Sequence, residues 1–211
     1  MNSSTHGLKK NLMVLAAVFI GTSALHATAI LTVGNTPQAG DQNVLLNTGL
    51  IGNPLFGTTN QTGFSVRFTG TETLTAPANG QARIEAQDLS LNSLKIDLPL
   101  ASFTSLILNL DASIDGTVTF TTDMTGASPT QTFTRAVTGS GSNFFTFTTI
   151  DGQRYDSILV ETTAPVSLTL TDAAQFRIGG AQNNVPDGGT TVAMLGMGLV
   201  GLFGLRRRFS V

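Results

Sequence analysis

Between residues 30 and 184, apolar and polar residues alternate in short runs, and helical periodicity is rare. In the run GFSVRFTG, Phe64, Val66 and Phe68 fall on one face of an extended chain, with polar residues between them. The same pattern occurs in LKIDLPL, GTVTFTTDM, QTFTRAVTG, NFFTFTTIDG, RYDSILVET and PVSLTLTD, separated by Gly, Asp, Asn and Pro at intervals of roughly 8–15 residues. This pattern predicts an all-β fold, a single β-sandwich domain with jelly-roll-like character.

The first 29 residues depart from this pattern. Lys9 and Lys10 precede an apolar stretch over residues 12–24, and Ala27 and Ala29 provide the small residues that signal peptidase requires before its cut. An uncleaved anchor is the alternative, but this stretch is short for a membrane span of about 20 residues. Residues 1–29 are therefore predicted to be a signal peptide, and the mature chain is expected to begin at Ile30.

The C-terminal segment, residues 185–211, has three parts. The extended segment that comes first consists of Val185, Pro186, Asp187, Gly188 and Gly189. Residues 190–205 carry no charge and would form a helix about 24 Å long, short for a hydrocarbon core of about 30 Å. Arg206, Arg207 and Arg208 follow, and the positive-inside rule places them on the cytoplasmic side. We expect a short transmembrane helix that holds the body outside the inner membrane transiently.

This arrangement of VPDGG, apolar helix and arginines resembles the sorting domain of the PEP-CTERM class, in its VPDGG-CTERM variant. The resemblance implies a Gram-negative bacterium that makes extracellular polysaccharide, and a tail recognised by exosortase, a membrane-embedded protease-transpeptidase. Residues 185–189 would then be the recognition segment. A buried helix is disfavoured by the four glycines between residues 196 and 204, because each costs about 1 kcal/mol in a soluble helix. A sortase signal of the Leu-Pro-x-Thr-Gly type and a GPI signal match poorly.

Charge and composition exclude several classes of function for the body, residues 30–184. It contains six basic and twelve acidic residues, a net charge of −6, which argues against nucleic acid as a partner. The chain has no cysteine, and both histidines, His6 and His26, lie in the predicted signal peptide. Chemistry that uses cysteine or histidine is therefore not expected in the mature protein.

Two kinds of carboxylate chemistry remain for the body. The turn-rich segment LDASIDGT contains Asp111 and Asp115, which are candidate ligands for calcium. No other cofactor is expected. Pairs such as Glu85 with Asp88, or Glu161 with a partner on another strand, are what a glycoside hydrolase without histidine would need. Any acidic secreted domain offers such pairs, so no catalytic residue is assigned and the protein is expected not to be an enzyme.

A short repeated sequence and a pair of adjacent phenylalanines are further candidate features of a binding site. GQARIEA and AQFRIGG share Gln-x-Arg-Ile, and we expect Arg83 and Arg177 to lie in strands and pair with acids or carbonyls on a neighbour. A ligand site formed by both arginines is the alternative. Phe144 and Phe145 are adjacent in a predicted strand, so their side chains should point to opposite faces.

These observations predict an exported protein of the cell surface or extracellular matrix, processed by signal peptidase and exosortase. A structural or adhesive role linked to extracellular polysaccharide is the first hypothesis. A carbohydrate-binding module is the alternative, although the chain has no tryptophan and one tyrosine to stack on sugars. A hydrolase that uses carboxylates alone is the third.

Replacing Pro186 and Asp187 with Ala should leave uncut precursor in the membrane fraction, because the extended recognition segment is changed while the helix is kept. Deleting residues 190–211 should instead release the body as a soluble, unsorted domain. Intact mass of the surface protein, in cells with and without exosortase, measures both. A tail retained through Val211 while exosortase is active would contradict the sorting hypothesis.

Overall fold

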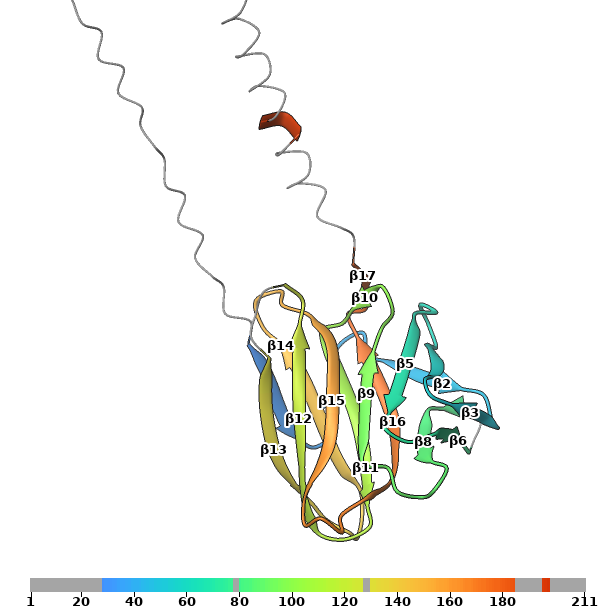
Figure 1. The fold of residues 1–211 in the computed structure, drawn as a ribbon. Helices are drawn as coiled ribbons and strands as arrows, with labels where there is room; N and C mark the ends of the chain where they lie inside the picture. Colours follow the sequence, from blue (N-terminus) through green and yellow to red (C-terminus); the bar gives the residue numbers. More distant parts are fainter. Residues whose placement is uncertain (1–27, 78–79, 127–129, 185–194, 198–211) are drawn as a thin grey trace, which may run out of the picture.

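Alternation of buried and exposed side chains builds the long strands of the domain. In β12 (Gly116–Met124), Val118 and Phe120 are fully buried, while Thr119 and Thr121, which alternate with them, face outward. The computed structural model describes residues 28–77, 80–126, 130–184 and 195–197. Within these ranges the chain forms two facing layers of antiparallel strands (Figure 1).

The remaining strands, in chain order, are β1 (Ala29–Val33), β2 (Gln42–Leu46), β3 (Leu50–Gly52), β4 (Leu55–Thr59), β5 (Ser65–Gly70), β6 (Leu74–Ala76), β7 (Gly80–Gln81), β8 (Arg83–Ala86), β9 (Ser93–Asp97), β10 (Ala101–Ser102), β11 (Ser105–Ala112), β13 (Gln131–Val137), β14 (Asn143–Thr149), β15 (Tyr155–Ala164), β16 (Leu170–Gly179) and β17 (Gln182–Asn183).

Strand order gives the fold its class. Layer one has the order β8-β16-β11-β14-β1, and layer two has the order β4-β5-β9-β15-β12-β13. From β8 to β16 the main strands alternate between the layers, except at the β12–β13 hairpin, which stays in layer two. This is the order of a double-sheet jelly roll. The predicted all-β, jelly-roll-like sandwich is confirmed.

Additional strands extend this jelly roll at one side. β2 pairs with β16 of layer one and with β4 of layer two, so it joins the two layers. The short strands β6 and β3 continue layer one beyond β8. β10 and β17 form a separate two-stranded sheet at one end of the sandwich.

The core between the layers is built from aromatic and aliphatic side chains. Phe120 of layer two lies with its ring centroid 4.8 Å from that of Phe145 and 5.1 Å from that of Phe147, both in layer one. Towards β16, Phe68 and Phe176 make a second contact between the layers, with centroids 4.8 Å apart. Edge-to-face pairs of this kind add about 0.5–1.5 kcal/mol each beyond the area that they bury.

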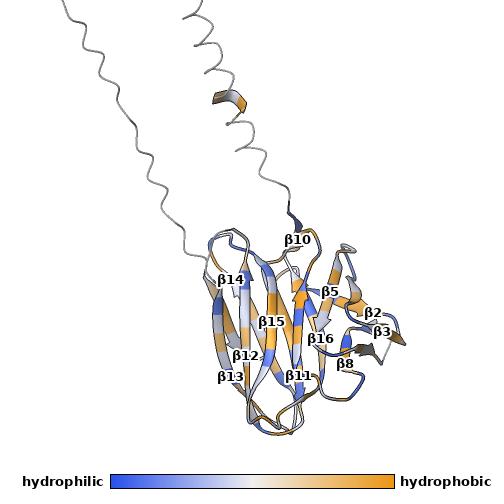
Figure 2. Cartoon of the chain, viewed as in Figure 1, coloured by the Kyte–Doolittle hydropathy of each residue, from blue (hydrophilic) through white to orange (hydrophobic). Residues whose placement is uncertain are grey.

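Threonines cover much of the outer face of layer two. The Thr119 hydroxyl lies 2.6 Å from that of Thr163 on β15 and 3.4 Å from that of Thr134 on β13. Apolar and polar residues both occur along the strands of the two layers (Figure 2). A β-branched residue with a hydroxyl suits such a face, because it favours the extended backbone and keeps the surface polar without charge.

Two strand expectations were wrong in detail. Residues 165–169 of PVSLTLTD lie outside any strand, and β16 begins at Leu170. Asp111 lies within β11 rather than in a turn, and only Asp115 is in the turn that follows. β11 shows no alternation because Leu106, Ile107 and Leu108 are buried on both of its faces.

The described strands of the domain run from Ala29 to Asn183, and the predicted boundaries of the body stay a prediction. β1 begins at Ala29, one residue before the predicted mature start, and Ala29 is buried beside Thr149 of β14. At the other end, the Asn184 amide N–H donates to the Leu100 carbonyl at 2.9 Å, next to the β10–β17 sheet. The start of β1 and the β10–β17 sheet lie at the same end of the sandwich (Figure 1).

Most of the predicted terminal segments lie outside the described residues. These segments are the signal peptide through Ala27, the VPDGG segment and the arginine cluster; of the predicted sorting helix, residues 195–197 are described and are helical. Within the described ranges no helix has the length and apolar character needed to cross a membrane.

Replacing Phe120 with Ala should lower the free energy of unfolding by about 3–5 kcal/mol, because it removes contacts that join the two layers. Phe56→Ala is the matched control, since Phe56 is half exposed on β4 and should matter by about 0.5 kcal/mol or less. Denaturant unfolding of the full chain measures both. Equal losses in the two variants would contradict the assigned core.

A candidate ligand pocket on layer one

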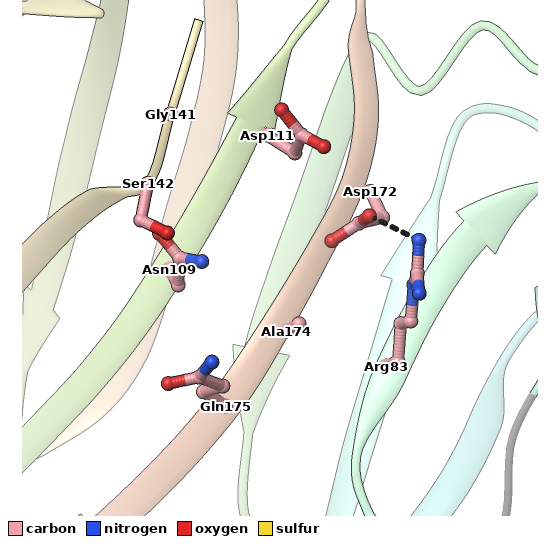
Figure 3. A pocket seen from close by; sticks show the side chains of 8 residues that line it. All are labelled: Arg83, Asn109, Asp111, Gly141, Ser142, Asp172, Ala174 and Gln175. Atoms are coloured by element: carbon pink, nitrogen blue, oxygen red, sulfur yellow. Dashed lines mark hydrogen bonds and ion pairs between the residues drawn. The ribbon is translucent and has the colours of Figure 1, made fainter.

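A polar pocket opens on the outer face of layer one. Its volume is about 320 Å³, and it is lined by Arg83, Asn109, Asp111, Gly141, Ser142, Asp172, Ala174 and Gln175. The lining comes from β8, β16 and β11 and from the segment that precedes β14, so four neighbouring parts of the layer contribute (Figure 3). Side chains that alternate with the core residues of these strands therefore meet on one face.

Asp111, Asp172 and Arg83 are the charged residues that line the pocket, and Glu85, outside the lining, pairs with Arg83. Asp111 and Asp172 are direct cross-strand neighbours on β11 and β16. Arg83 donates from Nη2 to Asp172 Oδ2 at 2.7 Å and lies 3.1 Å from Glu85 through Nε. The Asp172 side chain is only 6% exposed, and this burial raises the pKa of its carboxyl. Arg83 opposes the rise in pKa, whereas the charges of Asp111 and Glu85 add to it.

An amide in the pocket has an unused acceptor. Asn109 is 8% exposed and lines the pocket, between Phe144 of β14 and Ala174 of β16. Among the described residues, its Oδ1 atom has no hydrogen-bond partner. A buried polar atom without a partner costs about 1–3 kcal/mol, so Asn109 destabilises this face of layer one while its oxygen stays covered.

A β-bulge shapes the pocket at Gln175. The register of β11 against β16 shifts between Ile107 and Asn109, where Gln175 is the extra residue of β16. Gln175 has a φ of 55°, a conformation that non-glycine residues rarely adopt. Its amide N–H donates to the Ala82 carbonyl at 3.1 Å, which ties the bulge to the segment before β8. Bulges turn side chains away from the regular pleat, and this one presents Gln175 at the pocket.

Phe144 and Phe145 point to opposite faces, as the sequence predicts. Phe145 is buried against Phe120, whereas Phe144 is half-buried on the outer face, directly across from Asn109. An aromatic side chain therefore stands next to the polar pocket.

The two arginines of the repeated Gln-x-Arg-Ile sequence have different surroundings. The segments that contain them pair through β8 and β16, and Arg83 pairs with acids as expected. Arg177 lies opposite Ile107 and Asn43 and does not line the pocket. A ligand site formed jointly by Arg83 and Arg177 therefore has no support in this pocket.

The predicted calcium ligands have separate environments. Asp111 lines the pocket, next to Asp172. Asp115 Oδ1 instead accepts a hydrogen bond from the Gly139 amide at 2.8 Å, between two turns. Within the described ranges, no three acidic or histidine side chains are grouped so that they could hold a metal ion. Calcium binding at Asp111 and Asp115 stays a prediction.

The carboxylates that the sequence offered for glycoside hydrolysis do not lie together in this pocket. Glu85 pairs with Arg83, and Asp88 Oδ1 accepts the Ser90 amide N–H at 3.0 Å in a turn. Glu161 is exposed on β15, on layer two. Sequence reasoning did not single out Asn109, Gln175 or Asp172 as site residues; for Asp172 the only signal was its position in an alternating run.

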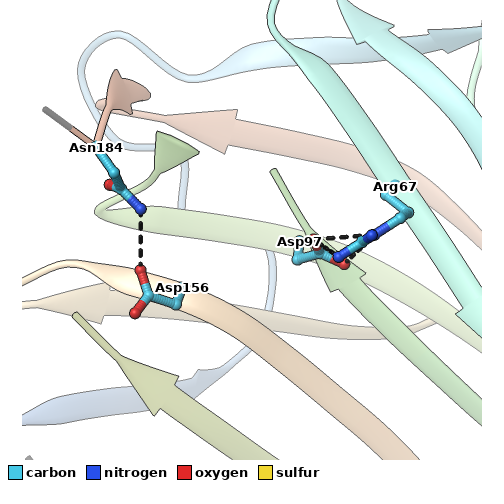
Figure 4. Close-up of polar contacts among 4 residues, drawn as sticks. All are labelled: Arg67, Asp97, Asp156 and Asn184. Atoms are coloured by element: carbon cyan, nitrogen blue, oxygen red, sulfur yellow. Dashed lines mark hydrogen bonds and ion pairs between the residues drawn. The ribbon is translucent and has the colours of Figure 1, made fainter. Parts of the chain in front are cut away.

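A second polar pocket, of about 280 Å³, lies near the end of the domain from which residue 185 continues. This pocket contains an ion pair between Arg67 and Asp97, which lie on adjacent strands. The distance from Arg67 Nη2 to Asp97 Oδ2 is 2.7 Å (Figure 4). The hydrogen bond to Asp97 raises the pKa of Arg67. Asp156 accepts from the Asn184 amide at 3.5 Å in the same region. Arg67 and Asp97 use their hydrogen-bonding groups on each other. This pocket therefore has fewer free hydrogen-bonding groups for a ligand than the pocket on layer one.

Comparison with known families identifies the tail. A model described as the VPDSG-CTERM motif matches residues 184–209. The chain has Gly188 where the name of that motif has serine. The predicted CTERM sorting signal is therefore confirmed, and the chain is an exported protein sorted by exosortase.

Comparisons of the rest of the chain give little. A search of curated protein sequences finds no match. Among solved structures, the domain is similar to a family 29 carbohydrate-binding module from Piromyces equi, with 12% sequence identity over 73% of this chain and 91% of that chain. The TM-score is 0.26, which is too low for this likeness to bear on fold or function.

Replacing Arg83 with Gln should lower the free energy of unfolding by about 1–3 kcal/mol, because buried Asp172 loses its charged partner and keeps two acidic neighbours. Lys95→Gln, which removes the same charge from an exposed site on β9, should change it by about 0.5 kcal/mol or less. Denaturant unfolding measures both variants. If the two variants unfold alike, the Arg83–Asp172 pair does not support the pocket.

Proposed function

We propose that this protein is a surface or matrix protein that adheres to extracellular polysaccharide through the pocket on layer one. The tail motif supports this proposal, because it marks the chain as an exported, sorted protein, and an extracellular polysaccharide would be met outside the cell. The observation that carries the proposal is the open polar pocket that brings Asp111, Asp172 and Gln175 together on one face of layer one.

The chemistry of the pocket matches a ligand rich in hydroxyl groups. A sugar hydroxyl both donates and accepts hydrogen bonds, and the pocket offers acceptors at Asp111 and Asp172. Donors are available from the Gln175 amide and the Arg83 guanidinium. Specific sites combine a few such polar groups with apolar surface. Phe144 supplies that surface, because the C–H face of a sugar ring can pack against it.

Binding is favoured over hydrolysis by the contact between Asp172 and Arg83. A glycosidase needs one carboxyl group as a proton donor and a second as nucleophile or base. Arg83 donates to one oxygen of Asp172 at 2.7 Å, so that oxygen is not free to give a proton to a glycosidic oxygen. We therefore propose a non-enzymatic role.

The proposal is tested by binding of the purified full chain to the polysaccharide of the cells that produce it. Asp111→Ala and Phe144→Ala should each weaken binding by about tenfold, which corresponds to the loss of about 1.4 kcal/mol, one hydrogen bond or one packed ring. Phe56→Ala removes an exposed phenylalanine from layer two and should bind like the unmodified chain.

Two results would contradict the proposal. One is no binding by the unmodified chain, and the other is equal binding by all three variants. Release of reducing ends from the polysaccharide would show turnover instead, and would replace the adhesive role by that of a hydrolase.

A further inference from the structure

The body ends in a short segment, residues 181–184, which we call the C-terminal strap. It contains β17, which pairs with β10 through two residue pairs at one end of the sandwich (Figure 1). Gln182, Asn183 and Asn184 are exposed. A two-residue sheet with an exposed strand is held by few hydrogen bonds and little buried surface. It therefore opens at a lower free energy than the core strands.

An arginine fixes the point at which the strap begins. Arg154 donates to the Ser102 hydroxyl from Nε and to the Ser102 carbonyl from Nη2, both at 2.8 Å, and to the Gly180 carbonyl from Nη2. Gly180 has a φ of 60°, and a Cβ at this position would overlap the Thr104 side chain. The turn at Gly180 is thus held to the body, whereas the strap beyond it is held by β10 and by the contacts of Asn184.

The sorting motif overlaps the strap by one residue. The match to the VPDSG-CTERM motif begins at residue 184. The Asn184 backbone N–H donates to the Leu100 carbonyl at 2.9 Å, and its side-chain amide donates to Asp156 Oδ1 at 3.5 Å (Figure 4). The first residue of the motif is therefore bonded to the folded body through both backbone and side chain. An enzyme that binds the motif from this residue must compete with these bonds.

The length of chain beyond the strap adds a steric constraint. Five residues, 185–189, separate Asn184 from the apolar run that starts at residue 190. They span at most about 17 Å when fully extended. A body of about 155 residues has a radius of gyration of about 15 Å, so a closed strap holds this body against any enzyme that binds residues 185–189. Release of residues 181–184 adds about 14 Å of chain.

We propose that the C-terminal strap opens before exosortase cuts the tail, so that cleavage proceeds from the minor population in which residues 181–184 have left β10. When opening and closing are faster than cleavage, the cleavage rate follows the population of the open form. The stability of the β10–β17 sheet then sets the rate at which the precursor is processed. This inference concerns processing of the tail and is independent of the polysaccharide pocket.

The first test locks the strap with a disulfide between Ala101 and Asn183. The adjacent pair of Leu100 and Asn184 is hydrogen-bonded, so Ala101 and Asn183 form a non-hydrogen-bonded pair, with Cα atoms about 4.5 Å apart. This spacing suits a disulfide. Ala101→Cys combined with Asn183→Cys, in a chain that has no other cysteine, should be cleaved at least about tenfold more slowly in cells with exosortase. Added reductant should restore the rate.

Pulse-chase labelling of the full precursor, followed by intact mass, measures the cut fraction in this test. The unmodified chain and Asn183→Cys alone are the controls, because neither can form the disulfide within the chain. Both should be cleaved at the same rate with and without reductant.

The second test weakens the strap at Gln182. Gln182 and Ser102 form the next hydrogen-bonded pair of the β10–β17 sheet, and proline has no N–H to donate. Gln182→Pro should raise the cleavage rate by about threefold to tenfold, the change in open population that loss of one hydrogen bond brings. Gln182→Ala keeps the backbone N–H and should be cleaved like the unmodified chain.

Two outcomes would overturn the inference. One is equal cleavage of the disulfide-locked chain with and without reductant, once intact mass shows that the bond has formed. The other is slower cleavage of Gln182→Pro than of Gln182→Ala when thermal unfolding shows that both are folded, because the β10–β17 sheet would then position the tail for the enzyme. The locked chain has the same sequence before and after reduction, so its result does not depend on the folding of a second variant.

Discussion

The contact of Phe120 with Phe145 and Phe147 is the interaction on which the rest of this molecule depends. Each layer of a sandwich has one apolar face, and burial of these two faces against each other stabilises the fold. Without that contact, the outer faces would have no fixed geometry. The outer face of layer two then carries threonines, and the outer face of layer one carries the polar pocket. One buried surface therefore positions two exposed surfaces of different character.

Several features of the pocket lower the free energy of unfolding, and burial of the core offsets this loss. It has a buried amide oxygen without a partner, two acids across from each other, and Gln175 in an unfavourable backbone conformation. Each feature costs free energy, and together they lie within one small region of layer one. Structures retain such features when the surroundings over-determine them, and they concentrate where ligands bind.

The strands that could be predicted are those with one face in the core and one in solvent. β12 was predicted over residues 116–124 because Val118 and Phe120 alternate with threonines. β11 was missed because Ile107 is as buried as its neighbours, so alternation disappears. The pocket escaped prediction for a related reason. Asn109 and Asp172 look ordinary in sequence, and only the register of β11 with β16 brings them together. The tail was recognisable because its signal is local and contiguous.

The pairing of Arg83 with Asp172 joins residues that are 89 positions apart, and β1 pairs with β14 across more than a hundred residues. Contacts of such long range form slowly, because a large loop must close before any of them is made. A chain that crosses a membrane from its N-terminus would have neither core nor pocket until β16 has emerged. The proposed ligand recognition would thereby be confined to the far side of that membrane, and the partly emerged chain would have no folded domain to obstruct its passage.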